Sequence, residues 1–526
     1  MPSDSGATTS PWMRTHLPEF PVLESDCKAD VCVIGGGITG LSTAYFLRQA
    51  GLSVVLLEDG ALGSGETGRT TAHISNALDD RYYELERMYG ERGARLAAES
   101  HSAAIEQIEA VVYHEGIDCD FTRLPGFLFL APGGSGDTLE RERIAALRAG
   151  LADVRLLPRA PLNSFDTGPC LQFPRQAQFH PFAYLAGLTH AIATAGGWIF
   201  TQTHVAEVKG GETCRVITDG GSVVTAGSVV VATNTPINDR LVIHTKQAPY
   251  RTYAIALRIP SGAVPLGLYW DTADPYHYVR LQRESEAEEL LIVGGEDHKT
   301  GQAQDTTARF GRLETWTRER FPMAGPVAFQ WSGQVMEPAD GLAYIGRNPV
   351  HSRNVYVATG DSGHGMTHAT IAGMLIRDLI TDRANPWESL YDPSRKITHS
   401  LGEYARENLN FVKQYADFVT RGEVSSVEEI APGAGAVLRH GMTKLAVYRD
   451  AAGDAHAYSA VCPHAGCIVH WNPTEESWDC PCHGSRFDPQ GHVVNGPANS
   501  ALAPVHIENI AGATQPQSAP KDQPPR

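Results

Sequence analysis

Residues 29–40 read A-D-V-C-V-I-G-G-G-I-T-G, and the helical pattern L-S-T-A-Y-F-L-R-Q-A follows at 41–50. An apolar run, a glycine-rich turn and a helical pattern in this order predict a β-strand that leads directly into a helix N-terminus. Gly35 permits the tight turn, Gly37 lets the backbone approach a pyrophosphate, and Gly40 lets the helix pack on the strand. The helix N-terminus would then face the phosphates.

A second predicted strand strengthens this interpretation. It covers Ser53–Leu57 and ends at Glu58, the acidic residue that the ribose hydroxyls of a dinucleotide require at this distance. A glycine-rich turn in an ordinary parallel sheet would explain the glycines but not the placed carboxylate. The sequence therefore predicts a dinucleotide-binding domain of the α/β class.

Two cysteine boxes lie near the C-terminus: the first is C-P-H-A-G-C at 462–467 and the second is C-P-C-H-G-S at 480–485. Together they offer two thiolates and two imidazoles, the ligand set of a Rieske [2Fe-2S] centre. The predicted ligands are Cys462, His464, Cys480 and His483. A structural zinc site also uses Cys and His pairs at short spacing. A zinc knuckle, however, has no use for the second cysteine in each box.

The surrounding sequence resembles the Rieske family. Residues 430–505 are similar to an all-β Rieske domain of the kind with a disulfide, and Gly496–Pro497 resembles the loop that covers the cluster. Cys467 and Cys482, which stand just behind a ligand in each box, suggest a disulfide that ties the two loops together. Such a disulfide would be unusual in a reducing compartment and would depend on burial beside the cluster.

Two further positions bear on the reduction potential. Ser485 matches the family's serine that donates a hydrogen bond to a cluster sulfur, which raises the potential. Phe487 stands where respiratory Rieske proteins commonly have a tyrosine, and it has no hydroxyl to donate. Within the family range of about −150 to +300 mV, we therefore expect a potential below the respiratory values.

Several segments favour FAD over NAD as the dinucleotide. The stretches 197–208, 229–235, 340–346 and 354–367 resemble the D-amino-acid oxidase-like family of FAD-dependent oxidoreductases, which includes glycine, sarcosine and dimethylglycine oxidases. The resemblance covers residues 30–382. It implies a glutathione-reductase-like FAD-binding fold with a mixed β-sheet that carries the substrate site, and the whole chain resembles bacterial fusions of such an oxidoreductase to a Rieske domain.

The same resemblance implies contacts with FAD. The backbone of Val205 would meet the adenine, and the segment N-V-Y-V-A-T-G-D-S-G-H-G-M-T at 354–367 would lie against the isoalloxazine. The helix that follows would stabilise a reduced flavin anion through its dipole. The predicted contacts in this segment are Gly360, Gly363, His364, Gly365 and Met366.

Two histidine patterns have alternative interpretations. His73, in T-T-A-H at 70–73, resembles the histidine that sarcosine and dimethylglycine dehydrogenases attach covalently to the flavin, but a histidine that only hydrogen-bonds near the ring fits equally well. The stretch D-S-G-H-G-M-T-H at 361–368 superficially resembles the two-His, one-carboxylate iron site of a Rieske oxygenase. We reject that interpretation because a mononuclear iron there would collide with the isoalloxazine.

Composition and net charge limit the classes of molecule that the protein is expected to bind. The 526 residues carry a net charge of −17 without long acidic runs, which argues against nucleic acid and anionic membranes. No secretory signal and no stretch of 18 apolar residues is evident, so we expect a cytoplasmic protein without membrane insertion. Five cysteines outside the boxes are scattered singly and are expected to be reduced.

The chain divides into five predicted segments. They are an N-terminal leader at 1–29, the FAD-dependent oxidoreductase at 30–382 with its substrate sheet mainly at 241–330, a helical connector at 383–429, the Rieske domain at 430–510, and a disordered tail at 511–526. The connector contains a predicted helix at Leu401–Val419.

These modules together predict an enzyme with two redox centres. We expect it to oxidise an amine or amino-acid-like C–N bond by hydride transfer to FAD, and to pass electrons singly through the cluster to a one-electron acceptor such as a ferredoxin or cytochrome. Tyr253, Tyr278 and Arg280, on the predicted sheet over the flavin, are candidates for binding a substrate carboxylate. Two alternatives are reverse electron flow, from the cluster to the flavin, and a redox sensor without substrate turnover.

Overall fold

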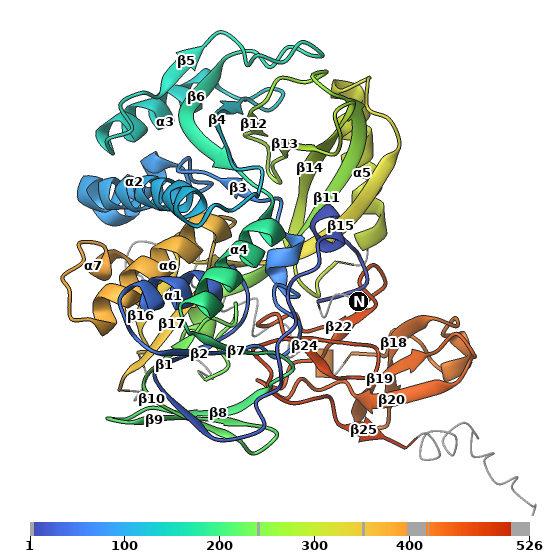
Figure 1. Ribbon diagram of the computed structural model, residues 1–526. Coiled ribbons are helices and arrows are strands. Elements are labelled where there is room, and N and C mark those ends of the chain that lie inside the picture. Colours follow the sequence, from blue (N-terminus) through green and yellow to red (C-terminus); the bar gives the residue numbers. More distant parts are fainter. Residues whose placement is uncertain are drawn as a thin grey trace, which may run out of the picture.

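The computed structural model describes residues 5–238, 242–303, 305–349, 353–396, 417–418 and 420–506. Residues before about 396 build a large body around two β-sheets, and residues after 420 form a smaller β region that packs beside it (Figure 1). Most of the predicted connector helix at Leu401–Val419 and the predicted tail at 511–526 lie outside the described residues.

The first sheet has eight strands in the order β16-β17-β10-β1-β2-β7, with β9 and β8 attached at β10. The strands β17, β10, β1, β2 and β7 run parallel. Their bounds are β1 Cys27–Ile34, β2 Val54–Leu57, β7 Trp198–Phe200, β8 Val205–Lys209, β9 Cys214–Thr218, β10 Val223–Val231, β16 Tyr344–Arg347 and β17 Val355–Thr359. This is the parallel sheet that the sequence predicts.

Successive side chains of β1 point to opposite faces of this sheet, and both faces are covered. Val31 and Val33 are buried with the helices α1 (Ile38–Gln49), α4 (Pro181–Thr194) and α6 (Gly365–Ile380) on one face. Cys32 and Ile34 are buried on the opposite face with the β8–β9 arm. Because both faces are covered, the last four residues of β1, 31–34, are all apolar and buried.

The second sheet has nine strands in the order β15-β11-β14-β13-β12-β4-β6-β3, with β5 paired to β6. It is mixed, since β12 and β4 are parallel and the other pairs are antiparallel. Its strands are β3 His73–Ile74, β4 Thr122–Phe129, β5 Arg155–Leu157, β6 Cys170–Gln178, β11 Gln247–Pro260, β12 Leu268–Asp271, β13 Tyr278–Arg283, β14 Glu288–Lys299 and β15 Val327–Pro338. The predicted mixed sheet is thus present, and it also includes strands before residue 241.

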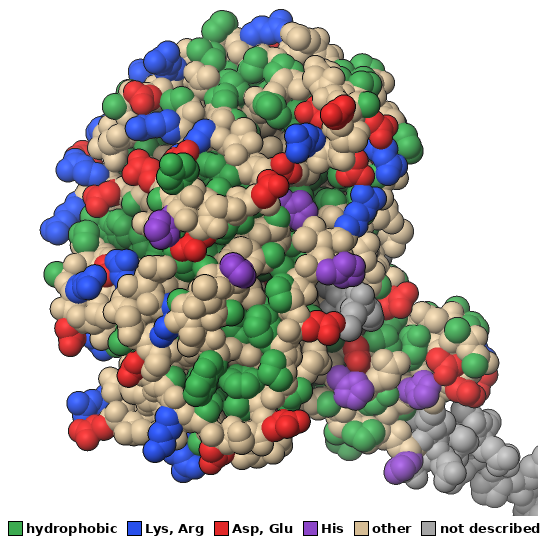
Figure 2. Space-filling view, viewed as in Figure 1, with side chains coloured by type: hydrophobic (Ala, Val, Ile, Leu, Met, Phe, Trp, Pro, Cys, Tyr) green, Lys and Arg blue, Asp and Glu red, His purple; other side chains and the backbone are tan. Residues whose placement is uncertain are grey.

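Helix α5 (Thr306–Arg320) covers one face of this second sheet through Phe310 and Leu313. The other described helical segments are α2 Tyr82–Glu115, α3 Gly136–Arg148, α7 Glu388–Tyr391, η1 Pro11–Arg14, η2 Glu66–Arg69, η3 His244–Lys246 and η5 Val427–Glu429. Among the described residues, none of these helices has the length and apolar character needed to cross a membrane. Acidic and basic side chains are intermingled over the face shown in Figure 2.

The C-terminal region is all β, as predicted. It contains two four-stranded sheets with the orders β18-β19-β20-β25 and β21-β22-β23-β24. Their bounds are β18 Ala434–His440, β19 Thr443–Arg449, β20 Ala455–Ser459, β25 Pro504–Val505, β21 His470–Asn472, β22 Ser477–Asp479, β23 Arg486–Phe487 and β24 Val493–Asn495. The first cysteine box lies between β20 and β21 and so joins the two sheets, whereas the second lies between β22 and β23. The sheet that contains β22 lies toward the large body (Figure 1).

Candidate functional site

A cavity of about 770 Å³ lies between the two large sheets and the C-terminal region. Its volume falls in the usual range for small-molecule and cofactor sites. The lining comes from the ends of β1, β2 and β10, from the 357–366 segment, from β11, β13 and β15, and from residues 488–499 of the C-terminal region. All three parts of the chain therefore contribute to one site.

The end of the cavity at β1 has the predicted features of a dinucleotide cradle. Gly35 has φ +110°, and a Cβ there would lie 2.4 Å from the carbonyl oxygen of Ala232. A Cβ at Gly40 would lie 1.8 Å from the carbonyl oxygen of Gly35, so only glycine permits this turn. Gly37 lines the cavity as the N-cap of α1. These constraints fit a bound pyrophosphate, which needs close backbone and a helix N-terminus.

Glu58 also lines this end of the cavity. Its carboxylate accepts hydrogen bonds from the backbone N–H groups of Gly36 and, at 2.9 Å, Gly60. Val205 lines the cavity nearby, and its carbonyl oxygen accepts a 3.0 Å hydrogen bond from Asn499 Nδ2. The C-terminal region therefore closes the end where we predict the adenosine, which the sequence did not indicate.

The opposite end of the cavity is formed by the 357–366 segment. All five predicted contacts, Gly360, Gly363, His364, Gly365 and Met366, line it. Helix α6 begins at Gly365, so its N-terminus faces the cavity, where the dipole favours negative charge. His364 accepts a 3.0 Å hydrogen bond at Nε2 from the backbone N–H of Asp79. This arrangement fits the isoalloxazine position that the sequence implies.

His73 lines the same end, from the short strand β3. Its Nδ1 lies 3.1 Å from Thr71 Oγ1, while its buried Nε2 has no hydrogen-bond partner among the described residues. Burial, followed by the charge of Arg280, lowers the pKa of His73 to about 3. A neutral imidazole with an open nitrogen fits either predicted role beside a flavin, so attachment stays a prediction.

The three candidate substrate residues do not all line the cavity. Tyr278 lines the cavity, with its ring centroid 5.5 Å from that of His73. Tyr253 does not: its strand turns it toward α5, where its hydroxyl contacts His298 Nε2 at 2.9 Å and its ring packs on Phe310. The residues of β11 that face the cavity are instead Tyr250 and Thr252.

The predicted position of Arg280 in the substrate site is also wrong. Its side chain is fully buried and lies outside the cavity lining, with Nη1 donating to the carbonyl oxygens of Thr71, Ala72 and Phe179 at 3.0–3.1 Å. Burial lowers the pKa of Arg280 to about 9. Arg280 therefore holds the loop that carries His73, and it does not face a substrate carboxylate.

Acidic side chains that no sequence pattern predicted line the cavity near Tyr278. The hydroxyl of Tyr276 donates to Asp79 Oδ2 at 2.8 Å, and Ser362 donates to Glu337 Oε2 at 2.8 Å. Burial, offset in part by Thr252, raises the pKa of Asp297 to about 7. Burial and then the charge of Asp80 raise the pKa of Glu337 well above its usual range. Long-range folding brings these carboxylates together.

The cysteine boxes bring their predicted ligands together in two pairs. The thiols of Cys462 and Cys480 share a hydrogen bond, which lowers the pKa of Cys462 and raises that of Cys480. The rings of His464 and His483 have centroids 5.0 Å apart. Burial lowers the pKa of His483 to about 3, which keeps the imidazole neutral as metal binding requires. Two pairs fit two irons better than one zinc.

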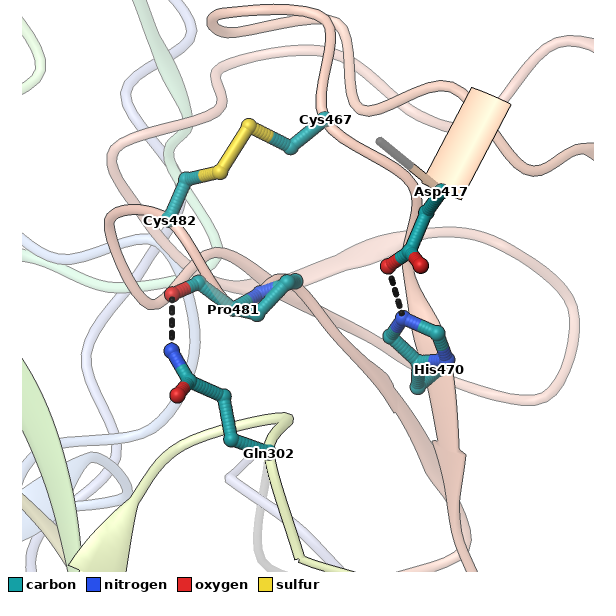
Figure 3. Close-up of a disulfide and its surroundings, with 6 residues drawn as sticks. All are labelled: Gln302, Asp417, Cys467, His470, Pro481 and Cys482. Carbon is teal, nitrogen blue, oxygen red and sulfur yellow. Dashed lines mark hydrogen bonds and ion pairs between the residues drawn. A yellow bond between two sulfur atoms is a disulfide. The ribbon is translucent and has the colours of Figure 1, made fainter. Parts of the chain in front are cut away.

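A disulfide, a hydroxyl group and an aromatic ring surround the predicted ligands. The structure joins Cys467 to Cys482 by a disulfide (Figure 3). Ser485 is buried, hydrogen-bonds the sulfur of Cys462, and accepts a 3.0 Å bond from the backbone N–H of Ala498. Phe487 is buried in the same apolar cluster as the box cysteines.

The second cysteine box docks directly on the large body. Gln334, which lines the cavity, donates from Nε2 to the carbonyl oxygen of Gly484 at 2.9 Å. A Cβ at Gly484 would lie 2.7 Å from Cβ of Pro249, so only glycine allows this approach. Gln302 also donates to the carbonyl oxygen of Pro481 at 3.4 Å (Figure 3). Gln334 therefore links the cavity lining directly to the second cysteine box.

Comparison with known proteins agrees with this geometry. The family model for FAD-dependent oxidoreductases of the DAO type matches residues 30–379, and the Rieske [2Fe-2S] model matches residues 420–506. The YhfW Rieske 2Fe-2S iron-sulfur protein of Bacillus subtilis (strain 168) is 32% identical over 94% of this chain and 96% of its own length.

Other relatives match single modules. Gamma-glutamylputrescine oxidoreductase of Escherichia coli (strain K12) is 28% identical over 70% of this chain and 88% of its own length. The chloroplastic cytochrome b6-f iron-sulfur subunit of Oryza sativa subsp. japonica is 47% identical over 66 residues, which are 12% of this chain and 29% of the subunit. Glycine oxidase from Geobacillus kaustophilus has the same fold, with a TM-score of 0.59 and 19% identity over 70% of this chain and 99% of the oxidase. The chain therefore belongs to the DAO family of FAD-dependent oxidoreductases and is an enzyme that binds FAD and, in a C-terminal Rieske domain, a [2Fe-2S] cluster.

Proposed function

We propose that this enzyme oxidises the C–N bond of a cationic amine and sends the two electrons singly through the Rieske cluster to an external acceptor, such as a ferredoxin or cytochrome. When bound, FAD supplies a hydride acceptor and the cluster supplies a one-electron carrier. The observation that carries the proposal is the position of Gln334, which lines the cavity and hydrogen-bonds the second cysteine box. Two redox sites this close suit internal electron transfer.

The charge of the cavity supports an amine rather than an α-amino acid. Among the described lining residues, Arg69 is the only Lys or Arg. Its guanidinium already donates to the carbonyl oxygens of Gly6 and Ser332 and to the side chains of Thr8 and Glu475. Carboxylates surround the Tyr276 and Tyr278 pair instead, and an ammonium group would relieve their mutual repulsion. The relative named gamma-glutamylputrescine oxidoreductase, by its name, also handles an amine.

The residues at this end of the cavity suggest a path for the protons. An ammonium group has to lose one proton before a hydride can leave the neighbouring carbon, and Asp297, with a pKa of about 7, is suited to accept it. Loss of the hydride then leaves an iminium ion, R–CH=NH₂⁺, which water converts to an aldehyde and ammonium. Thr252 Oγ1 contacts the hydroxyl of Tyr278 at 2.8 Å, which would orient that ring beside the substrate.

Anaerobic mixing of the oxidised holoenzyme with candidate substrates tests this function. We expect primary amines and diamines to bleach the flavin absorbance, and α-amino acids of similar size to do so poorly. The double variant His464→Ala/His483→Ala should still bleach, because the ligands lie outside the cavity lining, but it should not turn over with a one-electron acceptor. Absence of bleaching by every amine, with flavin reduction only after the cluster is reduced by ferredoxin, would favour reverse electron flow.

A further inference from the structure

The contact between the Rieske domain and the oxidoreductase is built around one buried carboxylate, that of Glu475, between β21 and β22. Its side chain is 1% exposed. Arg69 Nη1 lies 3.1 Å from Glu475 Oε2, and Arg251 Nη2 lies 3.4 Å from Oε1. The hydroxyl of Ser332 also donates to this carboxylate. The Rieske domain thus supplies the anion, and the oxidoreductase supplies both cations.

The N-terminal segment completes this contact. Thr8 donates to the carboxylate of Glu475 from Oγ1 at 2.6 Å and from its backbone N–H at 3.1 Å. Its hydroxyl also accepts a 2.9 Å hydrogen bond from Arg69 Nη1. Figure 1 shows the N-terminus beside β22 of the Rieske domain. We refer to Glu475, Arg69, Arg251, Ser332 and Thr8 as the Glu475 clamp.

The electrostatics of the clamp make it specific for one docking pose. Although burial disfavours its charge, Arg69, Arg251 and Arg486 lower the pKa of Glu475 to about 2, so the carboxylate is ionised at neutral pH. Arg69 and Arg251 are 3% and 0% exposed. Any pose that withdrew Glu475 would leave these two buried cations without that partner, which is far more costly than losing a surface ion pair.

The clamp is also connected to both redox sites. Arg69 is part of the cavity lining, and Ser332 stands two residues before Gln334 on β15. Glu475 stands five residues before the ligand Cys480. A shift at the clamp would therefore move the second cysteine box relative to the cavity.

We propose that the Glu475 clamp is a positioning device that holds the cluster loop against the cofactor cavity, so that electrons cross between FAD and cluster in one docked geometry without movement of the Rieske domain. In each crossing one electron leaves one centre and reduces the other. The inference rests on the internal transfer in the proposed function, but it is independent of the substrate and of the direction of flow.

The test compares Glu475→Gln with the matched control Glu476→Gln in the full-length holoenzyme. Glu476 is the exposed neighbour, so the same chemical change is made one residue away from the clamp. The flavin is reduced by a laser flash with an external photoreductant, and equilibration with the cluster is followed by absorbance. Because this trigger needs no amine, failure of the proposed substrate would not affect the result. FAD content, cluster EPR spectrum and cluster potential are measured for every variant.

We expect Glu475→Gln to slow equilibration about tenfold or more, since small misplacements of redox or reacting groups carry large rate penalties. Its rate should also fall with added glycerol, because the domain now has to find its pose, whereas the wild type and Glu476→Gln should be insensitive to viscosity. EPR spectrum and potential should stay unchanged. Thr8→Val, which removes hydrogen bonds but no charge, should show a smaller effect of the same kind.

Two results would overturn the inference. One is a Glu475→Gln holoenzyme with wild-type equilibration and no dependence on viscosity. The other is a wild type that is itself viscosity-limited, which would mean that the domain moves. Should Glu475→Gln yield no protein with both cofactors, Thr8→Val decides, and an unchanged rate in that variant contradicts the clamp.

Discussion

The imidazole ring of His244 lies with its centroid 4.8 Å from that of His464 and 5.7 Å from that of His483. His244 belongs to η3 of the oxidoreductase, and its side chain is 2% exposed. The imidazole edge of the cluster site is therefore covered by the same chain. Electrons from an internal donor would enter at this edge, and an external acceptor would have to use another surface of the Rieske domain.

The hydrogen bonds around the cluster predict opposite effects of two substitutions on its potential. Ser485→Ala removes a hydroxyl that bonds the Cys462 sulfur, and Phe487→Tyr adds a hydroxyl within the apolar cluster that holds the box cysteines. A hydrogen bond worth about 0.5–1.5 kcal/mol corresponds to about 20–60 mV for one electron. We expect the potential to fall in the first variant and to rise in the second in an EPR-monitored redox titration.

Unchanged potentials in both variants would show that neither side chain reaches the cluster. A fall in Phe487→Tyr would show that the buried hydroxyl disrupts the packing instead of donating to a sulfur.

The disulfide predicts a loss of stability on its removal. Cys467 and Cys482 are separated by 15 residues, and constraining a loop of that length in the unfolded chain is worth about 3 kcal/mol. The variant Cys467→Ser/Cys482→Ser should therefore lower the free energy of unfolding of the Rieske domain by about that amount, measured by denaturant titration of the cluster absorbance. Stability equal to the wild type would mean that the bridge does not form in the isolated protein.

The ion pairs of His470 lead us to expect that the stability of the Rieske domain depends on pH between neutral and alkaline values. Burial disfavours its charge, but hydrogen bonds to Asp417 and Glu423 outweigh burial and raise the pKa of His470 to about 9. Figure 3 shows the contact between His470 and Asp417. The folded value lies above the unfolded one of about 6.5, so this stabilisation is complete below about pH 6.5 and is lost as pH rises toward 9. We expect a loss of order 1–3 kcal/mol over that window.

The control for this prediction is His470→Gln, which cannot be protonated. Its unfolding free energy should start lower and change less between pH 6.5 and 9 than that of the wild type. Parallel pH profiles for the two proteins would contradict the assignment.

Sequence patterns predicted the local parts of the site and missed the parts that long-range folding assembles. The turn at Gly35 and the two cysteine boxes were correctly placed because their spacing is set within a few residues. The predicted substrate-binding role of Tyr253 was wrong because the sequence does not reveal which face of β11 meets the cavity. Its neighbour Thr252 lines the cavity instead. The same limit applies to Asp297 and Glu475, whose partners come from distant segments of the chain.

If Asp297 contacts the ammonium group of the substrate, its charge should determine the preference for cationic amines. Asp297→Asn keeps the shape but removes the charge, and loss of a hydrogen bond to a charged group costs about 1.5–3 kcal/mol. We expect kcat/KM for a cationic amine to fall by about ten- to 150-fold, with FAD content unchanged. The wild-type rate should rise through about pH 7 as the carboxyl group of Asp297 ionises, and the variant should lack this step.

Asp274→Asn is the matched control, since Asp274 also lines the cavity but is exposed. It should retain both the rate and the pH profile. Equal losses in the two variants would indicate a general effect of cavity charge and not a specific contact of Asp297.

In the proposed reaction, electrons cross from the cavity to the cluster within one molecule. Rapid mixing of the oxidised holoenzyme with an amine substrate, without oxygen or acceptor, followed by freeze-quench EPR, measures this most directly. We predict that the Rieske signal appears after flavin bleaching, in a first-order phase whose rate does not change with protein concentration. A bleached flavin with an oxidised cluster, or a rate that rises in proportion to protein concentration, would contradict internal transfer.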